Sequence, residues 1–161
     1  MAGFCFLLWL VLSCKALSVD DPIRQFFYGL RGDVLTPIVI GITNLSNTKF
    51  VIALCLVLLI LRPTRMTYGI PVSAGAILVT ILNKTIKHFV QRPRPGDIVH
   101  LVREGGFSFP SGHSITSMFV YGLLLYLIQT HVENRRIRTA LSVLVAIPLV
   151  LVGPSRIYLG V

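Results

Sequence analysis

Three segments of this sequence carry side chains that could bind and transfer a phosphoryl group. The first, Phe109-Pro110-Ser111-Gly112-His113, directly precedes a long apolar stretch. Ser111 could cap the helix that begins there, and the N–H groups of the first turn would then face an anion. Gly112 leaves room for phosphate to approach the backbone, and His113 could supply a proton near neutral pH. On their own, these residues also fit a plain turn with a hydrogen-bonded histidine.

The other two segments supply cations near the ends of apolar stretches. One is Lys87-His88-Phe89-Val90-Gln91-Arg92-Pro93-Arg94-Pro95, in which two prolines end the helix that carries Lys87. The other is Gly153–Val161, where Arg156 follows the last apolar stretch. Guanidinium groups can grip the equatorial oxygens of a phosphoryl group in its transition state. A lone Lys or Arg here would more often reach toward lipid headgroups, so the prediction depends on all three segments together.

The elements that must position these residues are membrane helices. Of the 161 residues, 54% are hydrophobic and 13% are charged, and the mean hydropathy is +0.80. This composition indicates an integral membrane protein. Apolar stretches predict an all-α, polytopic membrane helical bundle with five spanning helices, at about 3–19, 44–61, 66–83, 114–129 and 137–153. The first stretch could also belong to a signal peptide, but no Lys or Arg precedes it, which favours a retained helix.

The order of the spans brings the three segments to one membrane face. No internal repeat or second domain is evident, so residues 1–161 are predicted to form a single integral-membrane domain. Five spans place the connections Asp20–Thr43 and Lys84–Pro110 on the same side as Pro154–Val161. Asp20–Thr43 fits either a helix in the membrane interface or a packed loop. By raw counts of Lys and Arg this face is cytoplasmic, whereas two short Arg-rich turns favour the opposite orientation.

The charge and the remaining polar residues argue against other classes of protein. A net charge of +9 would suggest a nucleic-acid partner for a soluble protein, but the membrane spans argue against nucleic acid here. Cys5, Cys14 and Cys55 all lie in apolar stretches without disulfide or metal-ligand spacing, so we expect them to be packing residues. No His and carboxylate cluster has ligand spacing, so no metal is predicted. Most charges lie at span ends, which is not typical of a transporter.

The order of these motifs resembles the three-part signature of the type 2 phosphatidic acid phosphatase (PAP2) superfamily, in its membrane lipid-phosphate phosphatase branch. The resemblance rests on Lys87 to Arg94-Pro95, then Pro110 to His113, then Ser155-Arg156. It implies a six-span bundle in the plasma membrane with the active site at the non-cytoplasmic face, and it implies no cofactor. By resemblance, His113 is the general acid that protonates the leaving group, and the phosphate is bound by Lys87, Arg94, Ser111, Gly112 and Arg156.

The same resemblance implies a nucleophile beyond Val161. The family pattern runs Ser-Arg, five residues, His, three residues, Asp, which puts this histidine one residue after Val161, on the sixth span. None of His88, His100 and His131 fits that position. The chain is therefore expected to be C-terminally incomplete, with five of six spans, and inactive as it stands. The alternative is a naturally shortened relative that binds lipid phosphate without hydrolysing it.

The activity expected of the complete protein is hydrolysis of a terminal phosphate from a membrane lipid through a phosphohistidine intermediate. Phosphatidic acid, phosphatidylglycerophosphate and polyprenyl diphosphate all offer such a group, and the sequence favours none of them. Little of the chain lies outside the spans, which favours a lipid over a soluble phosphate ester. The expected partners are therefore a lipid-phosphate substrate and the bilayer.

Overall fold

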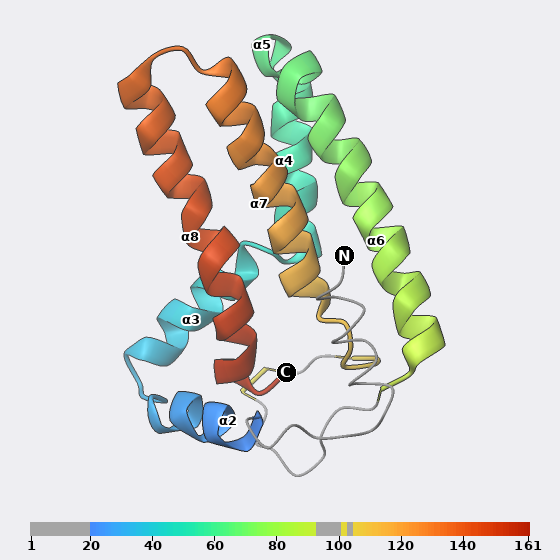
Figure 1. The fold of residues 1–161 in the computed structure, drawn as a ribbon, viewed down its shortest axis with the longest axis vertical. Helices are drawn as coiled ribbons and strands as arrows, with labels where there is room; N and C mark the ends of the chain where they lie inside the picture. Colours follow the sequence, from blue (N-terminus) through green and yellow to red (C-terminus); the bar gives the residue numbers. More distant parts are fainter. Residues whose placement is uncertain (1–19, 93–100, 103–104) are drawn as a thin grey trace.

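All regular secondary structure in the described part of the chain is helical. The computed structural model describes residues 20–92, 101–102 and 105–161. The helices are α2 (Asp20–Gly29), α3 (Leu35–Asn44), α4 (Thr48–Ile60), α5 (Arg62–Thr64), the π-helix η1 (Arg65–Gly69), α6 (Ile70–Val90), α7 (Gly112–His131) and α8 (Arg135–Leu159). Figure 1 shows α4, α6, α7 and α8 running side by side, with α2 and α3 toward one end. The all-α prediction is confirmed, and the predicted span at 3–19 lies outside the described residues.

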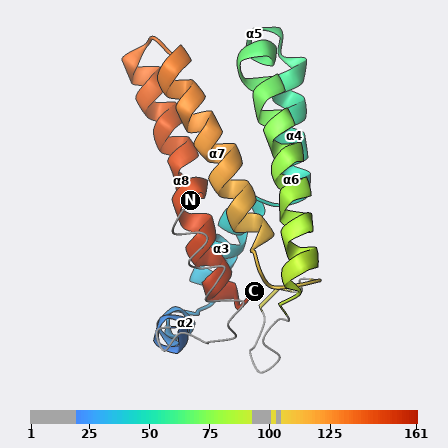
Figure 2. The ribbon, with the colours of Figure 1, turned by 45° about the vertical axis from the view of Figure 1, so that its right-hand side comes forward.

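Two of these helical segments are long and apolar enough to cross a membrane. They are Arg62–Val90, with 29 residues, and α8, with 25 residues, and they contain the predicted spans at 66–83 and 137–153. The pair α3 and α4 would add a third crossing as one span bent by 50°. The predicted span at 114–129 lies within α7, which has 20 residues and is not among these candidate spans, so its crossing of the membrane stays a prediction. Figure 2 shows α7 between α6 and α8, where its polar groups can meet protein.

The segment Asp20–Thr43 forms two helices, so the alternative of a packed loop is wrong. The helix α2 lies across the end of the bundle, beside the end of α8 (Figures 1 and 2). It leaves Ile23 46% exposed and Phe26 65% exposed. An amphipathic helix with exposed apolar side chains fits the membrane interface, and its location there stays a prediction.

Short polar side chains define where the spanning helices begin. The Asn47 side chain accepts a hydrogen bond from the Lys49 N–H at 3.2 Å and caps α4. The Asn134 side chain accepts from the N–H groups of Arg136 and Ile137 and caps α8. These side chains replace the helical partners that the first turn lacks. The same kind of cap begins α7, at the site described below.

The core forms where α7 packs against α4 and α6. Its buried members are Val51, Cys55, Val72, Ala76, Val120, Tyr121, Leu124 and Leu127. Buried hydroxyls of α7 have protein acceptors: Ser117 donates to the Pro148 carbonyl at 2.7 Å, and Tyr121 donates to the Leu45 carbonyl. These bonds stabilise the bundle because an apolar interior offers no water to replace them. Large apolar side chains face outward, among them Leu78, which is 63% exposed, and Met118, which is 70% exposed, as expected beside lipid.

At the far end of the bundle, α4 turns back into α6 through α5 and the π-helix η1. The Thr64 hydroxyl donates to the Leu58 carbonyl at 3.0 Å, and Arg65 Nε donates to the Leu59 carbonyl at 2.7 Å. These bonds occupy carbonyls that the end of α4 leaves without helical partners. Gly69 permits the close approach, since a Cβ there would lie only 2.7 Å from the Leu58 carbonyl oxygen.

We predict that Gly69→Ala lowers the melting temperature of the detergent-solubilised protein. The added methyl must displace the Leu58 backbone, at a cost of about 1–3 kcal/mol. Gly122→Ala is the matched control, because no atom lies within 4 Å of its Cβ position and alanine favours the helix by about 1 kcal/mol. Equal melting temperatures for the two variants would contradict the close approach at Gly69.

Candidate phosphate site

Three helices have an end at the same end of the bundle, and these ends carry predicted site residues. Lys87 is in the last turn of α6, Gly112 and His113 begin α7, and Arg156 is in the last turn of α8. Figures 1 and 2 show these helix ends at the same end of the molecule, near the C-terminus. Arg94, the sixth predicted residue, lies outside the described residues. The three helix ends therefore lie at one end of the molecule, and the joint binding of phosphate by their side chains stays a prediction.

Hydrogen bonds attach the connection between α6 and α7 to two of these helix ends. Ser108 donates through its N–H and its hydroxyl to the Arg92 carbonyl, at 2.9 and 3.1 Å, just beyond α6. The Leu101 N–H donates to the Leu159 carbonyl at the end of α8, at 3.1 Å. The segment that leads into Ser111 is thus tied to both neighbouring helix ends.

Ser111 caps α7. Its backbone is extended, and its hydroxyl oxygen accepts hydrogen bonds from the Ser114 N–H at 3.4 Å and from the Ser114 hydroxyl at 3.1 Å. The first turn of a helix directs its N–H groups along the axis, and the helix dipole adds partial positive charge there. The start of α7 therefore has the geometry of an anion site, and the half-buried His113 is part of its first turn.

Asn83 is a neighbour of this site that the sequence analysis missed. Its Nδ2 would lie 3.1 Å from a Cβ at Gly112, so glycine lets α6 and α7 approach here. Its Oδ1 is buried, and no hydrogen-bond partner exists for it in the described part of the chain. Asn83 lies one turn before Lys87 and on the same side of α6. The sequence offered one signal, the side-chain amide of Asn83 at the end of the predicted span. A polar residue is common at a span boundary, so Asn83 did not stand out as a site residue.

Arg156 is held inside the protein. It is only 5% exposed, and its Nη1 donates to the Thr43 hydroxyl oxygen at 3.3 Å. The sequence analysis expected Arg156 to follow the last span, but α8 continues through Pro154 to Leu159. Membrane helices tolerate proline because neighbouring helices and side chains can satisfy the backbone groups that proline leaves without a partner. Gly160, with a φ of 78°, ends α8, and the Val161 N–H donates to the Arg156 carbonyl.

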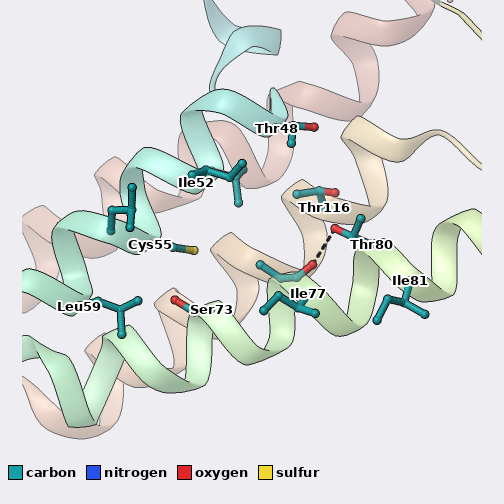
Figure 3. Close-up of a pocket in the computed structure, with 12 residues that line it drawn as sticks. Thr48, Ile52, Cys55, Leu59, Ser73, Ile77, Thr80, Ile81 and Thr116 are labelled. Carbon is teal, nitrogen blue, oxygen red and sulfur yellow. Dashed lines mark hydrogen bonds between the residues drawn. The ribbon is translucent and has the colours of Figure 1, made fainter.

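A cavity of about 390 Å³ lies between α4, α6 and α7. Figure 3 shows its lining, which is mostly aliphatic and includes Ile52, Cys55 and Ile77. Its polar lining residues include Thr80, one turn before Asn83 on α6, and Thr116, one turn after Gly112 on α7. The Thr80 hydroxyl donates to the Ala76 carbonyl at 2.7 Å. The apolar cavity therefore extends along the helices toward the start of α7.

The described side chains do not form a metal centre. Across 20–92, 101–102 and 105–161, no three His, Cys, Asp or Glu side chains come together as metal ligands would. The chemical groups at the site are instead a helix N-terminus with a hydroxyl, an imidazole and an amide, beside a lysine and a buried guanidinium. This set matches an anion with several oxygen atoms.

We predict that Ser111→Ala and Asn134→Ala lower the melting temperature by similar amounts, since each removes a helix cap worth about 1 kcal/mol. Only Ser111→Ala should also weaken binding of orthovanadate, a phosphate analogue, because Asn134 caps α8 at the opposite end of the bundle. Titration of the purified variants measures both effects. Equal vanadate affinity in the two variants would remove Ser111 from the anion site.

The chain is similar to known membrane phosphatases. The family model described as the PAP2 superfamily matches residues 68–161. Phosphatidylglycerophosphatase B of Bacillus subtilis (strain 168) is 30% identical over 168 residues, covering 97% of this chain and 80% of that protein. The crystal structure of the first transmembrane PAP2 type phosphatidylglycerolphosphate phosphatase, from Bacillus subtilis, matches with a TM-score of 0.81 and 27% identity, over 99% of this chain and 83% of that one. The chain therefore belongs to the PAP2 superfamily.

Proposed function

We propose that this protein, with the nucleophile that the family pattern expects beyond Val161, removes the terminal phosphate from a membrane lipid phosphate. The observation that carries the proposal is that Lys87, the capped start of α7 and the buried Arg156 all lie at one end of an apolar bundle. Membership of the PAP2 superfamily supports the reaction class. Similarity to phosphatidylglycerophosphatase B makes phosphatidylglycerophosphate the first substrate to test, ahead of phosphatidic acid and polyprenyl diphosphate.

Each residue of the site has a role in this proposal. Lys87, Arg94 and Arg156 neutralise the phosphate, and Ser111 and the Gly112 N–H donate hydrogen bonds to it. The expected histidine attacks phosphorus, the bond from phosphorus to the lipid oxygen breaks, and His113 gives its proton to that oxygen. Water then cleaves the phosphohistidine and releases inorganic phosphate. The proposal puts this end of the bundle at the non-cytoplasmic face of the plasma membrane, as the family resemblance implies.

The cavity between α4, α6 and α7 supports a lipid over a soluble phosphate ester. Its wall is mostly aliphatic, and it extends along α6 and α7 toward Asn83 and Gly112. An acyl chain in this cavity would remain in an apolar environment while its headgroup reached the start of α7. Binding of the tail would then position the phosphate, as remote binding energy does in many enzymes.

We predict that His113→Ala lowers kcat for phosphate release by about 10²- to 10⁴-fold, the range of general acid catalysis. The assay uses detergent-solubilised protein expressed from its native reading frame, with phosphatidylglycerophosphate as substrate. His131→Ala is the matched control, because His131 is exposed at the opposite end of α7, where it contacts the Leu127 carbonyl and the Tyr68 ring.

If His113→Ala releases phosphate as fast as the unaltered protein, His113 is not part of the mechanism. If the unaltered protein binds lipid phosphate and releases no phosphate, the proposed hydrolysis is wrong and the protein is a lipid-phosphate binder.

We predict that Ile77→Trp raises KM for a long-chain lipid phosphate roughly tenfold, equivalent to about 1.4 kcal/mol. The indole would fill the cavity that Ile77 lines. Leu78→Trp is the matched control, since Leu78 has the same exposure of 63% and does not line the cavity. Hydrolysis of the water-soluble p-nitrophenyl phosphate should be equal in both variants. A similar KM for the lipid in both variants would contradict tail binding in this cavity.

A further inference from the structure

We propose that Thr43 is a positioning residue that fixes the guanidinium of Arg156 for phosphate binding, an inference that rests on the proposed function. The two residues are 113 positions apart in the chain, and the Arg156 Nη1 donates to the Thr43 hydroxyl oxygen at 3.3 Å. Thr43 is 3% exposed and Arg156 is 5% exposed. A buried guanidinium requires hydrogen-bond acceptors, and a bond between two buried groups is protected from competing water.

A threonine suits this role better than a carboxylate would. Its hydroxyl is a neutral acceptor, so it orients the guanidinium and leaves the positive charge available to an anion. An Asp or Glu would neutralise that charge and compete with phosphate for the same donors. Because a guanidinium is planar and its five N–H groups have fixed directions, a bond to one Nη nitrogen sets the plane of the whole group.

The helix that carries Thr43 is itself fastened to α8 near Arg156. Tyr158, two residues after Arg156, is 2% exposed, and its hydroxyl lies 2.9 Å from the Thr36 hydroxyl oxygen. The Gly32 N–H donates to the Tyr158 hydroxyl at 3.3 Å. Arg31 Nε donates to the Tyr158 carbonyl at 3.0 Å, while its guanidinium carbon lies 3.8 Å from the Tyr28 ring centroid.

These contacts hold α3 against α8 at two levels. Thr36 and Thr43 are seven positions apart, about two helical turns, so both can face α8. The first level is the contact of Thr36 with Tyr158, and the second is the contact of Thr43 with Arg156. Thr43 therefore has a fixed position from which to orient the guanidinium. Thr43 lies before residues 68–161, so the side chain that orients Arg156 comes from outside the part of the chain that the family model matches.

The test compares three variants of the protein expressed from its native reading frame. Thr43→Val keeps the branched shape and removes the hydroxyl, and Thr43→Ser keeps the hydroxyl. Ser117→Ala is the matched control, because Ser117 is a buried hydroxyl that donates to the Pro148 carbonyl away from the site. Orthovanadate affinity, KM for phosphatidylglycerophosphate and melting temperature are measured for each.

We expect Thr43→Val to weaken vanadate binding and raise KM roughly tenfold, as for loss of a hydrogen bond to a charged group. Thr43→Ser should retain most of the affinity, and Ser117→Ala should lower only the melting temperature. Should Thr43→Val not fold, Tyr158→Phe provides the test, since it loosens α3 from α8 and should weaken vanadate binding in the same direction.

The outcomes separate this inference from the proposed function. If the unaltered protein hydrolyses the lipid and the Thr43→Val and Tyr158→Phe variants bind vanadate equally well, the positioning role is wrong and the proposed function stands. If the unaltered protein neither binds vanadate nor releases phosphate, both are overturned. If Thr43→Ser loses as much vanadate affinity as Thr43→Val, the effect comes from altered packing and not from loss of the hydroxyl.

Discussion

The buried guanidinium of Arg156, in the last turn of α8, needs a hydrogen-bond acceptor from another helix. Arg156 lies where the bundle is nearly closed to solvent, and desolvation of a charged group is costly unless hydrogen bonds replace water. The acceptor comes from α3, so α3 must be held against α8, and Tyr158 provides the contact that holds it. The connection between α6 and α7 is attached to the same region through the Leu159 carbonyl. A position that could bind phosphate therefore depends on three separate segments of the chain.

The two ends of the bundle are stabilised in different ways. At the far end, polar side chains bond to carbonyls six positions away, as Thr64, Arg65 and Arg138 do. At the site end, hydrogen bonds join residues more than one hundred positions apart, including Arg31 to Tyr158 and Thr43 to Arg156. Local bonds can form as soon as a turn folds, whereas long-range bonds need the whole bundle. Long-range hydrogen bonds thus hold Arg31 and Arg156 at the end where distant segments meet.

Local signals explain which features could be predicted from the sequence. Apolar length predicted the helices that became α4, α6, α7 and α8, and Ser111 before an apolar stretch predicted the cap of α7. The positions of Thr43 and Asn83 near the site could not be predicted, because each depends on packing between helices and not on neighbouring residues. The continuation of α8 through Pro154 could not be predicted from apolar length, because the apolar stretch ends at Gly153 and the polar Ser155 and Arg156 follow. Arg94 stays a prediction from resemblance.

The break between α3 and α4 has a consequence for the order in which the chain assembles. At this bend of 50°, the Leu45 carbonyl accepts a hydrogen bond from the Tyr121 hydroxyl of α7. A ribosome that makes the chain from its N-terminus delivers α3 and α4 to the membrane well before α7 exists. Until α7 has been made, the bend lacks this partner. The contact between the first and second halves of the bundle is therefore completed late in synthesis.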